Sequence, residues 1–273
     1  MLASIRAMEP FRRASSTTTL FKNLSSSDQY NYQGDTEHFK VYCEIPLGSV
    51  GANIAKAFLE SCEMDYNKIA SFFGGITPSN MPFRIFLGQF PQRPAGMMNV
   101  FHYSCEGTEI FVDIMDRANT NLNLIRYLAI SQVVEVFSAA QFLKWGCDTI
   151  YGEALSRDIA AELYPNESAH YATSAYWLNS DRLNLINSNK YAYDDFAALG
   201  CSVLFLYYLR HQLNFSWGQI IANAADTLEE TYAKLTRSED GFLKFKDLLL
   251  KYFPLGNQFS GSIGNPFPIQ TVI

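Results

Sequence analysis

The hydrophobic period of the chain changes near residue 120, and this change constrains the fold most. Before it, short alternating or continuous apolar runs are separated by Gly and Pro, which is typical of strands. After it, apolar residues recur at helical spacing almost to the end of the chain. Strands followed by a run of helices predict an α+β fold.

The elements expected before residue 120 are four strands and one long helix. The strands are predicted at 39–45, 82–87, 98–104 and 109–114, and the helix at 50–73. Gly74-Gly75 closes this helix. The helices expected after residue 120 are 124–143, 150–163, 195–214, 216–225, 228–235 and 241–253, with a further candidate at 168–177.

We expect a single domain over residues 36–253, because no flexible linker divides it. Its sheet lobe is 36–120 and its helical lobe is 121–253. Residues 1–35 are polar and turn-rich, which predicts a flexible N-terminal arm. Residues 254–273 hold several prolines, which predicts an extended C-terminal tail.

The charge balance argues against nucleic acid as the main partner. The chain has 21 Lys+Arg against 27 Asp+Glu, a net charge of −6, and no dense basic face to neutralise phosphates. No stretch reaches about 18 uninterrupted apolar residues, so no membrane span is expected. The first 27 residues are basic and rich in Ser and Thr, which favours a flexible tail, with a targeting segment as the alternative.

The cysteines are widely spaced and form no CxxC pair. An odd, dispersed set predicts buried free thiols in a reducing compartment, so we expect a soluble, cytoplasmic protein. The cysteines are Cys43, Cys62, Cys105, Cys147 and Cys201.

A polar cluster interrupts the most apolar predicted helix. Ser131 and Glu135 are four residues apart, so they project from one face, about 6 Å apart along the axis. Gln132 lies beside them, and an antiparallel helix pair would return Glu153 to the same face. Polar side chains among apolar helices cost free energy unless they bond to one another, to a metal or to water. We therefore expect a site here.

In the order of these elements and the spacing of these residues, the segment 36–165 resembles the gluzincin branch of the zinc metallopeptidases. In that family a helix carries H-E-x-x-H, a following helix supplies a Glu as third zinc ligand, and a small sheet with a backing helix comes first. The resemblance implies a zincin-like fold. It places Ser131 and Glu135 at the two His ligands, Gln132 at the general-base Glu and Glu153 at the third ligand.

Three of these four positions depart from the family. Ser131 is a poor zinc ligand, and the amide of Gln132 can orient a water molecule but cannot deprotonate it. Glu135 and Glu153 offer carboxylate oxygens alone, which suit Ca²⁺ or Mg²⁺ and bind them weakly. We therefore expect no zinc-dependent peptidase activity, no zinc site and no cofactor, with weak Ca²⁺ or Mg²⁺ binding as an alternative.

Three functions follow from this pattern. The first is a metallopeptidase-like pseudoenzyme that binds a peptide or small ligand in the former active-site cleft. The second is a metal-independent or hard-cation enzyme that uses Glu135 and Glu153 as acid and base in a specialised biosynthetic reaction. The third is a structural helical protein whose carboxylates pair with Arg126 or Arg157. The ligand and the oligomeric state stay open.

Several residues near the cluster are candidates for ligand binding. They are Ser131, Gln132, Trp145, Tyr151, Arg157 and His170. Aromatic residues at helical spacing pack in cores more often than they line pockets, so core packing is the alternative for the aromatic members. The other three histidines are dispersed and are expected at the surface or at the edge of the core. They are His38, His102 and His211.

Overall fold

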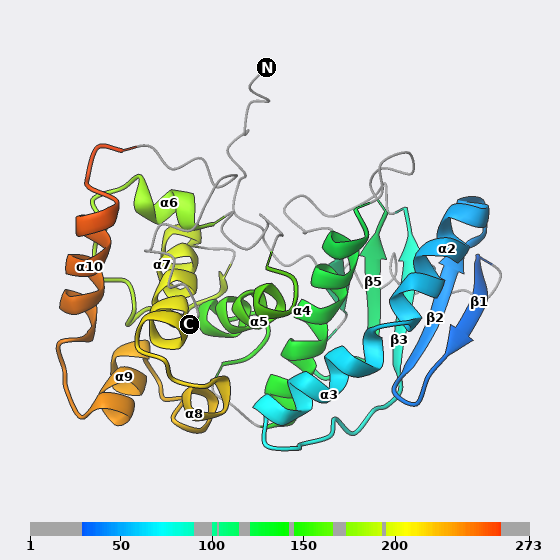
Figure 1. The fold of residues 1–273 in the computed structure, drawn as a ribbon, viewed down its shortest axis with the longest axis horizontal. Helices are drawn as coiled ribbons and strands as arrows, with labels where there is room; N and C mark the ends of the chain where they lie inside the picture. Colours follow the sequence, from blue (N-terminus) through cyan, green and yellow to red (C-terminus); the bar gives the residue numbers. More distant parts are fainter. Residues whose placement is uncertain are drawn as a thin grey trace.

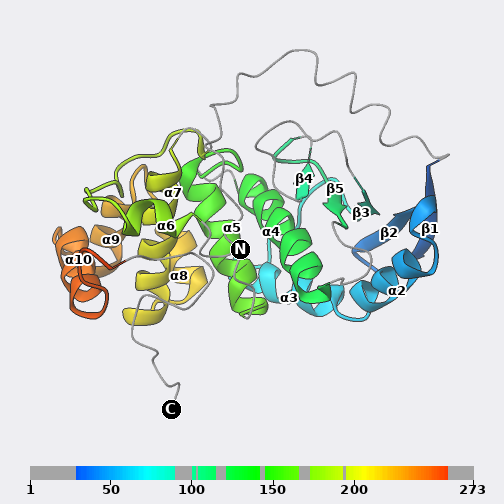
Figure 2. The ribbon, with the colours of Figure 1, turned by 90° about the horizontal axis from the view of Figure 1, so that it is seen from above.

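The computed structural model describes residues 29–89, 100–102, 104–114, 121–141, 145–165, 173–192 and 195–257. Over these residues the chain forms one five-stranded sheet and a larger set of helices, which confirms the α+β plan (Figure 1). The sheet lies at one end of the molecule and helices α6 to α10 lie at the other, with α4 and α5 between them (Figures 1 and 2).

The sheet is mixed, with the order β1-β2-β3-β5-β4. Its three central strands, β2, β3 and β5, run parallel, whereas β1 and β4 are antiparallel edge strands. The strands are β1 (Tyr30–Asp35), β2 (Phe39–Glu44), β3 (Phe83–Gly88), β4 (Val100–His102) and β5 (Glu109–Asp113).

The helices follow the predicted order. The first three are α2 (Gly48–Leu59), α3 (Cys62–Phe72) and α4 (Leu122–Ala140). The others are α5 (Ile150–Leu163), α6 (Ser174–Leu178), α7 (Phe196–Tyr207), α8 (Trp217–Ala222), α9 (Leu228–Thr236) and α10 (Gly241–Tyr252). A 3₁₀ turn, Ile45–Leu47, precedes α2, and a π-helical turn, Tyr208–Gln212, extends α7.

Two sequence expectations need correction. The flexible arm was expected to reach residue 35, but Tyr30–Asp35 is a strand that pairs with β2. Backbone hydrogen bonds to β2 hold this edge strand, and most of its side chains are not buried, so it has no apolar pattern to detect. The helix expected at 50–73 is two helices, and the break after Leu59 leaves Phe58 and Cys62 both fully buried.

The two faces of the sheet bury different side chains. Helices α2, α3 and α4 join the core on one face, where Val41, Ile85 and Val112 are fully buried (Figure 2). The other face carries a separate aromatic cluster, in which the ring of Phe111 stacks between Phe86 at 4.8 Å and Phe101 at 5.0 Å. Because side chains alternate along a strand, the residues on either side of Phe101 point toward α4.

A buried arginine joins the segment that follows α6 to the residues that follow α10. The Arg182 side chain is fully buried, and its guanidinium donates to the carbonyls of Leu178 at 2.9 Å and Phe253 at 2.6 Å. It also donates to Pro254 at 3.5 Å and lies over the Phe253 ring. Burial lowers the pKa of Arg182 from its ordinary value. The chain just after α10 is therefore anchored by its backbone carbonyls.

Within the described part of the chain, no helix combines the length and the apolar character needed to cross a membrane.

Candidate functional site

A buried polar cluster lies where β4, α4 and α5 meet. Glu135 is its centre: one carboxylate oxygen is hydrogen-bonded to Nε2 of His102 at 3.0 Å. The other oxygen accepts from Nε2 of Gln132 at 2.8 Å and from Oγ of Ser156 at 3.2 Å. The side chains of His102 and Glu135 are only 7% and 3% exposed, so these bonds form in a region with little water.

Three different elements bring these groups together. Gln132 and Glu135 are three residues apart on α4, a helix whose first turn is capped by the Asn121 side chain. Ser156 comes from the middle of α5, which packs along α4. His102 is the last residue of β4, and the alternation of side chains along that strand turns it toward α4.

The electrostatic surroundings favour a charged imidazole at His102. Burial is the largest single influence and opposes the charged form, but the influences that favour this form, first the hydrogen bond and the negative charge of Glu135, together outweigh burial. The backbone of Gly107 and the charge of Glu153 act in the same direction as Glu135. The pKa of His102 therefore lies above its ordinary value.

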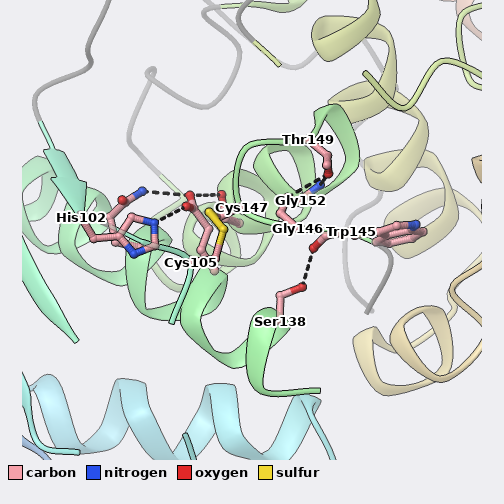
Figure 3. Close-up of a disulfide and its surroundings, with 11 residues drawn as sticks. His102, Cys105, Ser138, Trp145, Gly146, Cys147, Thr149 and Gly152 are labelled. Carbon is pink, nitrogen blue, oxygen red and sulfur yellow. Dashed lines mark hydrogen bonds and ion pairs between the residues drawn. A yellow bond between two sulfur atoms is a disulfide. The ribbon is translucent and has the colours of Figure 1, made fainter. Parts of the chain in front are cut away.

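A disulfide joins Cys105, just after β4, to Cys147, just before α5 (Figure 3). This corrects the expectation that all the cysteines are free thiols, and it removes the cysteine argument for a reducing compartment. The two residues are 42 positions apart, so their spacing gave no sign of pairing. The cysteines that are free and buried are Cys43, Cys62 and Cys201.

The turn that carries Cys147 is pressed against the first turn of α5. A Cβ atom on Gly152 would lie 1.9 Å from the carbonyl oxygen of Gly146, so only glycine fits there. The Thr149 side chain caps the same helix by accepting from the Gly152 amide at 3.2 Å. This close approach places Cys147 beside the polar cluster (Figure 3).

Potential metal-ligating atoms converge on Cys147. One ring nitrogen of His102, one carboxylate oxygen of Glu135 and Sγ of Cys147 all lie within 4.8 Å of one another. The same limit holds for Sγ of Cys105, Sγ of Cys147 and a carboxylate oxygen of Asp148. Among the residues that the structure describes, these are the two groups of this kind, and both contain Cys147.

The remaining residues of the predicted site have other contacts. Oγ of Ser131 donates to the Leu128 carbonyl of its own helix at 2.8 Å. Glu153 pairs with Arg157, one turn further along α5, at 3.4 Å. Arg126, the other cation considered for the glutamates, donates to the carbonyl of Ala57. Arg157 thus pairs with Glu153, whereas Glu135 pairs with His102.

The aromatic candidates belong to the core of the helical lobe. Trp145 and Tyr151 are both fully buried. Nε1 of Trp145 donates to the Ala225 carbonyl at 2.9 Å, and the hydroxyl of Tyr151 donates to the Ile186 carbonyl at 2.5 Å. Both rings therefore have a packing role here. His170 lies outside the described residues.

Sequence reasoning missed His102, Ser156 and the two bridged cysteines. His102 and Cys105 are three residues apart at the end of a predicted strand, and a His-x-x-Cys spacing of this kind is a usable signal for paired metal-ligating side chains. Ser156 had no such signal, because its role depends on how α5 packs against α4.

Comparisons with protein-family models, with curated proteins and with solved structures find no match to this chain. What the cluster can do is therefore inferred from its own residues and their geometry.

Proposed function

We propose that this chain is a zincin-like, metallopeptidase-like protein that lacks a competent zinc site and binds a peptide or small ligand beside α4. One observation carries the proposal: both carboxylate oxygens of Glu135 are already hydrogen-bonded to neighbouring side chains. These three hydrogen bonds use three of the roughly four lone-pair sites of a carboxylate, so little of Glu135 is left to bind a metal ion or to take a proton from water.

The neighbouring motif positions support the loss of zinc chemistry. Gln132 directs its amide at Glu135, and an amide has no basic oxygen with which to deprotonate water. Ser131 donates to the backbone of its own helix. Hydrolysis by a zinc-bound water needs imidazole ligands and a carboxylate base, and these positions supply neither.

The order of the elements supports the zincin-like part of the proposal. A mixed sheet with the backing helices α2 and α3 comes before α4, and Glu153 follows on α5. This is the order that the gluzincin resemblance implies. The antiparallel edge strand β4 packs beside α4, so the sheet edge and the helix border the same region.

An extended peptide is the ligand that this geometry favours. Within the part of the chain that the structure describes, β4 is the last strand of the sheet and pairs with β5. A peptide that adds as a strand to the edge of a sheet gains backbone hydrogen bonds. The disulfide holds the loop after β4 in place, which lowers the ordering cost of binding.

The binding test uses short random-sequence peptides displayed on phage and panned against the intact, disulfide-bonded chain. We expect selected peptides whose addition slows backbone hydrogen exchange in β4 and α4. The opposite edge strand, β1, is the matched control and keeps its exchange rate. Failure to select any peptide, or protection confined to β1, would overturn the proposal.

A second test concerns catalysis. The disulfide-bonded chain is incubated with Zn²⁺ and a mixture of casein peptides, and the peptides are followed by mass spectrometry. We expect no cleavage with or without the metal. Zinc-dependent cleavage that is lost in Glu135→Gln would show a working zinc site and contradict the proposal.

An enzyme using Glu135 and Glu153 is the second candidate. The observation in its favour is that the charges of both carboxylates raise the pKa of the same imidazole, His102. An imidazole hydrogen-bonded to a carboxylate, as His102 is to Glu135 at 3.0 Å, can pass a proton to a substrate. This candidate predicts that Glu135→Gln and Glu153→Gln each abolish turnover of an identified substrate while the fold persists; full activity in both variants would exclude it.

A further inference from the structure

We propose that the disulfide conceals a redox-controlled zinc site. When the bond between Cys105 and Cys147 is reduced, the two sulfur atoms join His102 and Glu135 as ligands of one Zn²⁺ ion. This closed site is structural and is distinct from the catalytic zinc site that we propose the chain lacks, and the inference does not depend on ligand binding at β4. This ligand set does not include Ser131, Gln132 or Glu153, the other positions matched to the gluzincin motif.

The positions of the donor atoms carry the inference. A ring nitrogen of His102, a carboxylate oxygen of Glu135 and Sγ of Cys147 lie within 4.8 Å of one another, and Sγ of Cys105 is bonded to Cys147. Around tetrahedral zinc, with bonds of about 2.0–2.3 Å, neighbouring donor atoms stand roughly 3–4 Å apart. The imidazole and carboxylate are already at 3.0 Å. Sγ of Cys105 is not part of that group, so on reduction it has to part from Cys147 and move toward His102 and Glu135.

The donor types also fit zinc. Two thiolates, one imidazole and one carboxylate are among its usual ligands, and four protein ligands make a closed site. The ion and its three anionic ligands sum to a net charge of −1. The buried site therefore carries no more charge with zinc and two thiolates than the Glu135 carboxylate carries alone. A closed site has no open position for a water molecule, and we therefore expect zinc to stabilise the fold here without giving peptidase activity.

The redox step is a thiol–disulfide exchange. A dithiol reductant transfers two electrons and two protons to the sulfur–sulfur bond, yielding two cysteine thiols, and is itself oxidised to a disulfide. Zn²⁺ then displaces the two thiol protons and one ring proton of His102, and the hydrogen bond between His102 and Glu135 gives way to a bond from each side chain to the ion. Both cysteines are partly exposed, so a reductant has access to the bond.

A second His–Glu pair provides an internal control. His38 and Glu63 are 2.7 Å apart, yet they form no metal-ligating group with a third residue in the described part of the chain. Cys62 and Cys201 are free, buried thiols outside both groups. These residues allow a metal site at the disulfide to be separated from metal binding by any histidine or thiol.

The experiment measures Co²⁺ and Zn²⁺ binding by the full chain before and after reduction with a non-chelating phosphine, which takes up the oxygen of a water molecule as the disulfide gains two electrons and two protons. Circular dichroism checks that the reduced chain stays folded. We expect the reduced chain to bind one equivalent of zinc. Its cobalt form should show thiolate-to-cobalt charge-transfer absorption and tetrahedral visible bands. The disulfide-bonded chain should show neither.

Variants assign the ligands. Cys147→Ser removes the atom shared by both groups and should abolish binding, and His102→Gln and Glu135→Gln should weaken it. Cys62→Ser, Cys201→Ser and His38→Gln should bind as the native chain does. Cys105→Ser leaves Cys147 as a free thiol without any reductant. This variant should therefore bind zinc under oxidising conditions, although more weakly than the reduced native chain. It tests the site even if the reduced native chain loses its fold.

Three results would overturn the proposal. The first is equal metal binding before and after reduction. The second is cobalt absorption without sulfur charge-transfer bands. The third is unchanged binding in Cys147→Ser, which would place the metal on other thiols of the chain.

Discussion

Two His–Glu pairs of this chain have the same chemistry in different surroundings. His38–Glu63 lies on the sheet lobe, with a distance of 2.7 Å and side chains that are 20% and 31% exposed. His102–Glu135 lies between the lobes, with a distance of 3.0 Å and exposures of 7% and 3%. The shorter contact is the more hydrated one, so distance alone does not rank the two pairs.

The difference lies in what else holds each glutamate. Glu63 also accepts from the backbone amide of His38 at 2.8 Å and remains in contact with water. Glu135 instead receives side-chain hydrogen bonds from two helices, and a disulfide closes the region around it. Breaking a buried pair leaves an uncompensated group, whereas water replaces a lost surface partner.

The largest expected effect comes from the disulfide, which only the buried pair has beside it. In Cys105→Ser/Cys147→Ser the free energy of unfolding should fall by about 4 kcal/mol, because the bond closes a loop of 42 residues in the unfolded chain. Urea unfolding at equilibrium measures this. Reduction of the native chain in a metal chelator should give a similar loss, and a loss below about 1 kcal/mol would show that the bond does not support this region.

The next effect should come from Glu135→Ala. It leaves His102, Gln132 and Ser156 without their shared acceptor, and we expect the free energy of unfolding to fall by about 3 kcal/mol. Glu135→Gln keeps the shape and one acceptor oxygen and should lose less. Urea unfolding of the two variants separates the contribution of the carboxylate charge from that of side-chain packing. If Glu135→Gln loses as much stability as Glu135→Ala, shape and packing do not account for the loss, and if Glu135→Gln loses none, the charge has no role.

A smaller effect is expected for Glu63→Ala at the hydrated pair. The free energy of unfolding should fall by about 1 kcal/mol or less, since water can replace the lost carboxylate. The same urea measurement applies. If this variant loses as much as Glu135→Ala, burial does not distinguish the two pairs and the comparison fails.

The pH dependence of stability should differ in sign between the pairs. The raised pKa of His102 gives a contribution that is complete below the unfolded value of about 6.5 and is lost as the pH rises through the folded pKa. For Glu63, burial opposes ionisation, but hydrogen bonds from Thr36 and His38 outweigh it and lower the pKa. Its contribution is present above the unfolded value of about 4.3 and is lost as the pH falls through the folded pKa.

Unfolding free energies from about pH 3 to about pH 9 test this difference. His102→Gln should flatten the decline on the alkaline side, and Glu63→Gln should flatten the decline on the acid side. The same alkaline decline in the native chain and in His102→Gln would contradict the role of the imidazole.

Much of the fold could be predicted because the elements carry local signals. Helix α5 occupies the predicted range 150–163, since a capping Thr149 precedes an apolar period that ends before Pro165. The edge strand β1 could not be predicted, because Asn31, Gly34 and Asp35 have low strand propensity and the strand forms through its pairing with β2.

The candidate site could be predicted only where its residues share a helix. Gln132 and Glu135 are three residues apart, and their contact follows from helical geometry. His102 is 33 residues from Glu135 and Cys105 is 42 from Cys147, so those contacts depend on how β4 and α5 pack against α4. The gluzincin resemblance drew attention to the helix but named positions, such as Ser131, whose side chain turns back to its own backbone.

The buried guanidinium of Arg182 has a practical consequence for anyone shortening this protein. Its acceptors include the carbonyls of Phe253 and Pro254, which follow the last helix. A recombinant version that ends with that helix, at Tyr252, would leave the buried Arg182 guanidinium without these two acceptors and should express poorly or precipitate. A version that ends at Asn257 keeps both acceptors, so trimming for crystallisation is best begun beyond that residue.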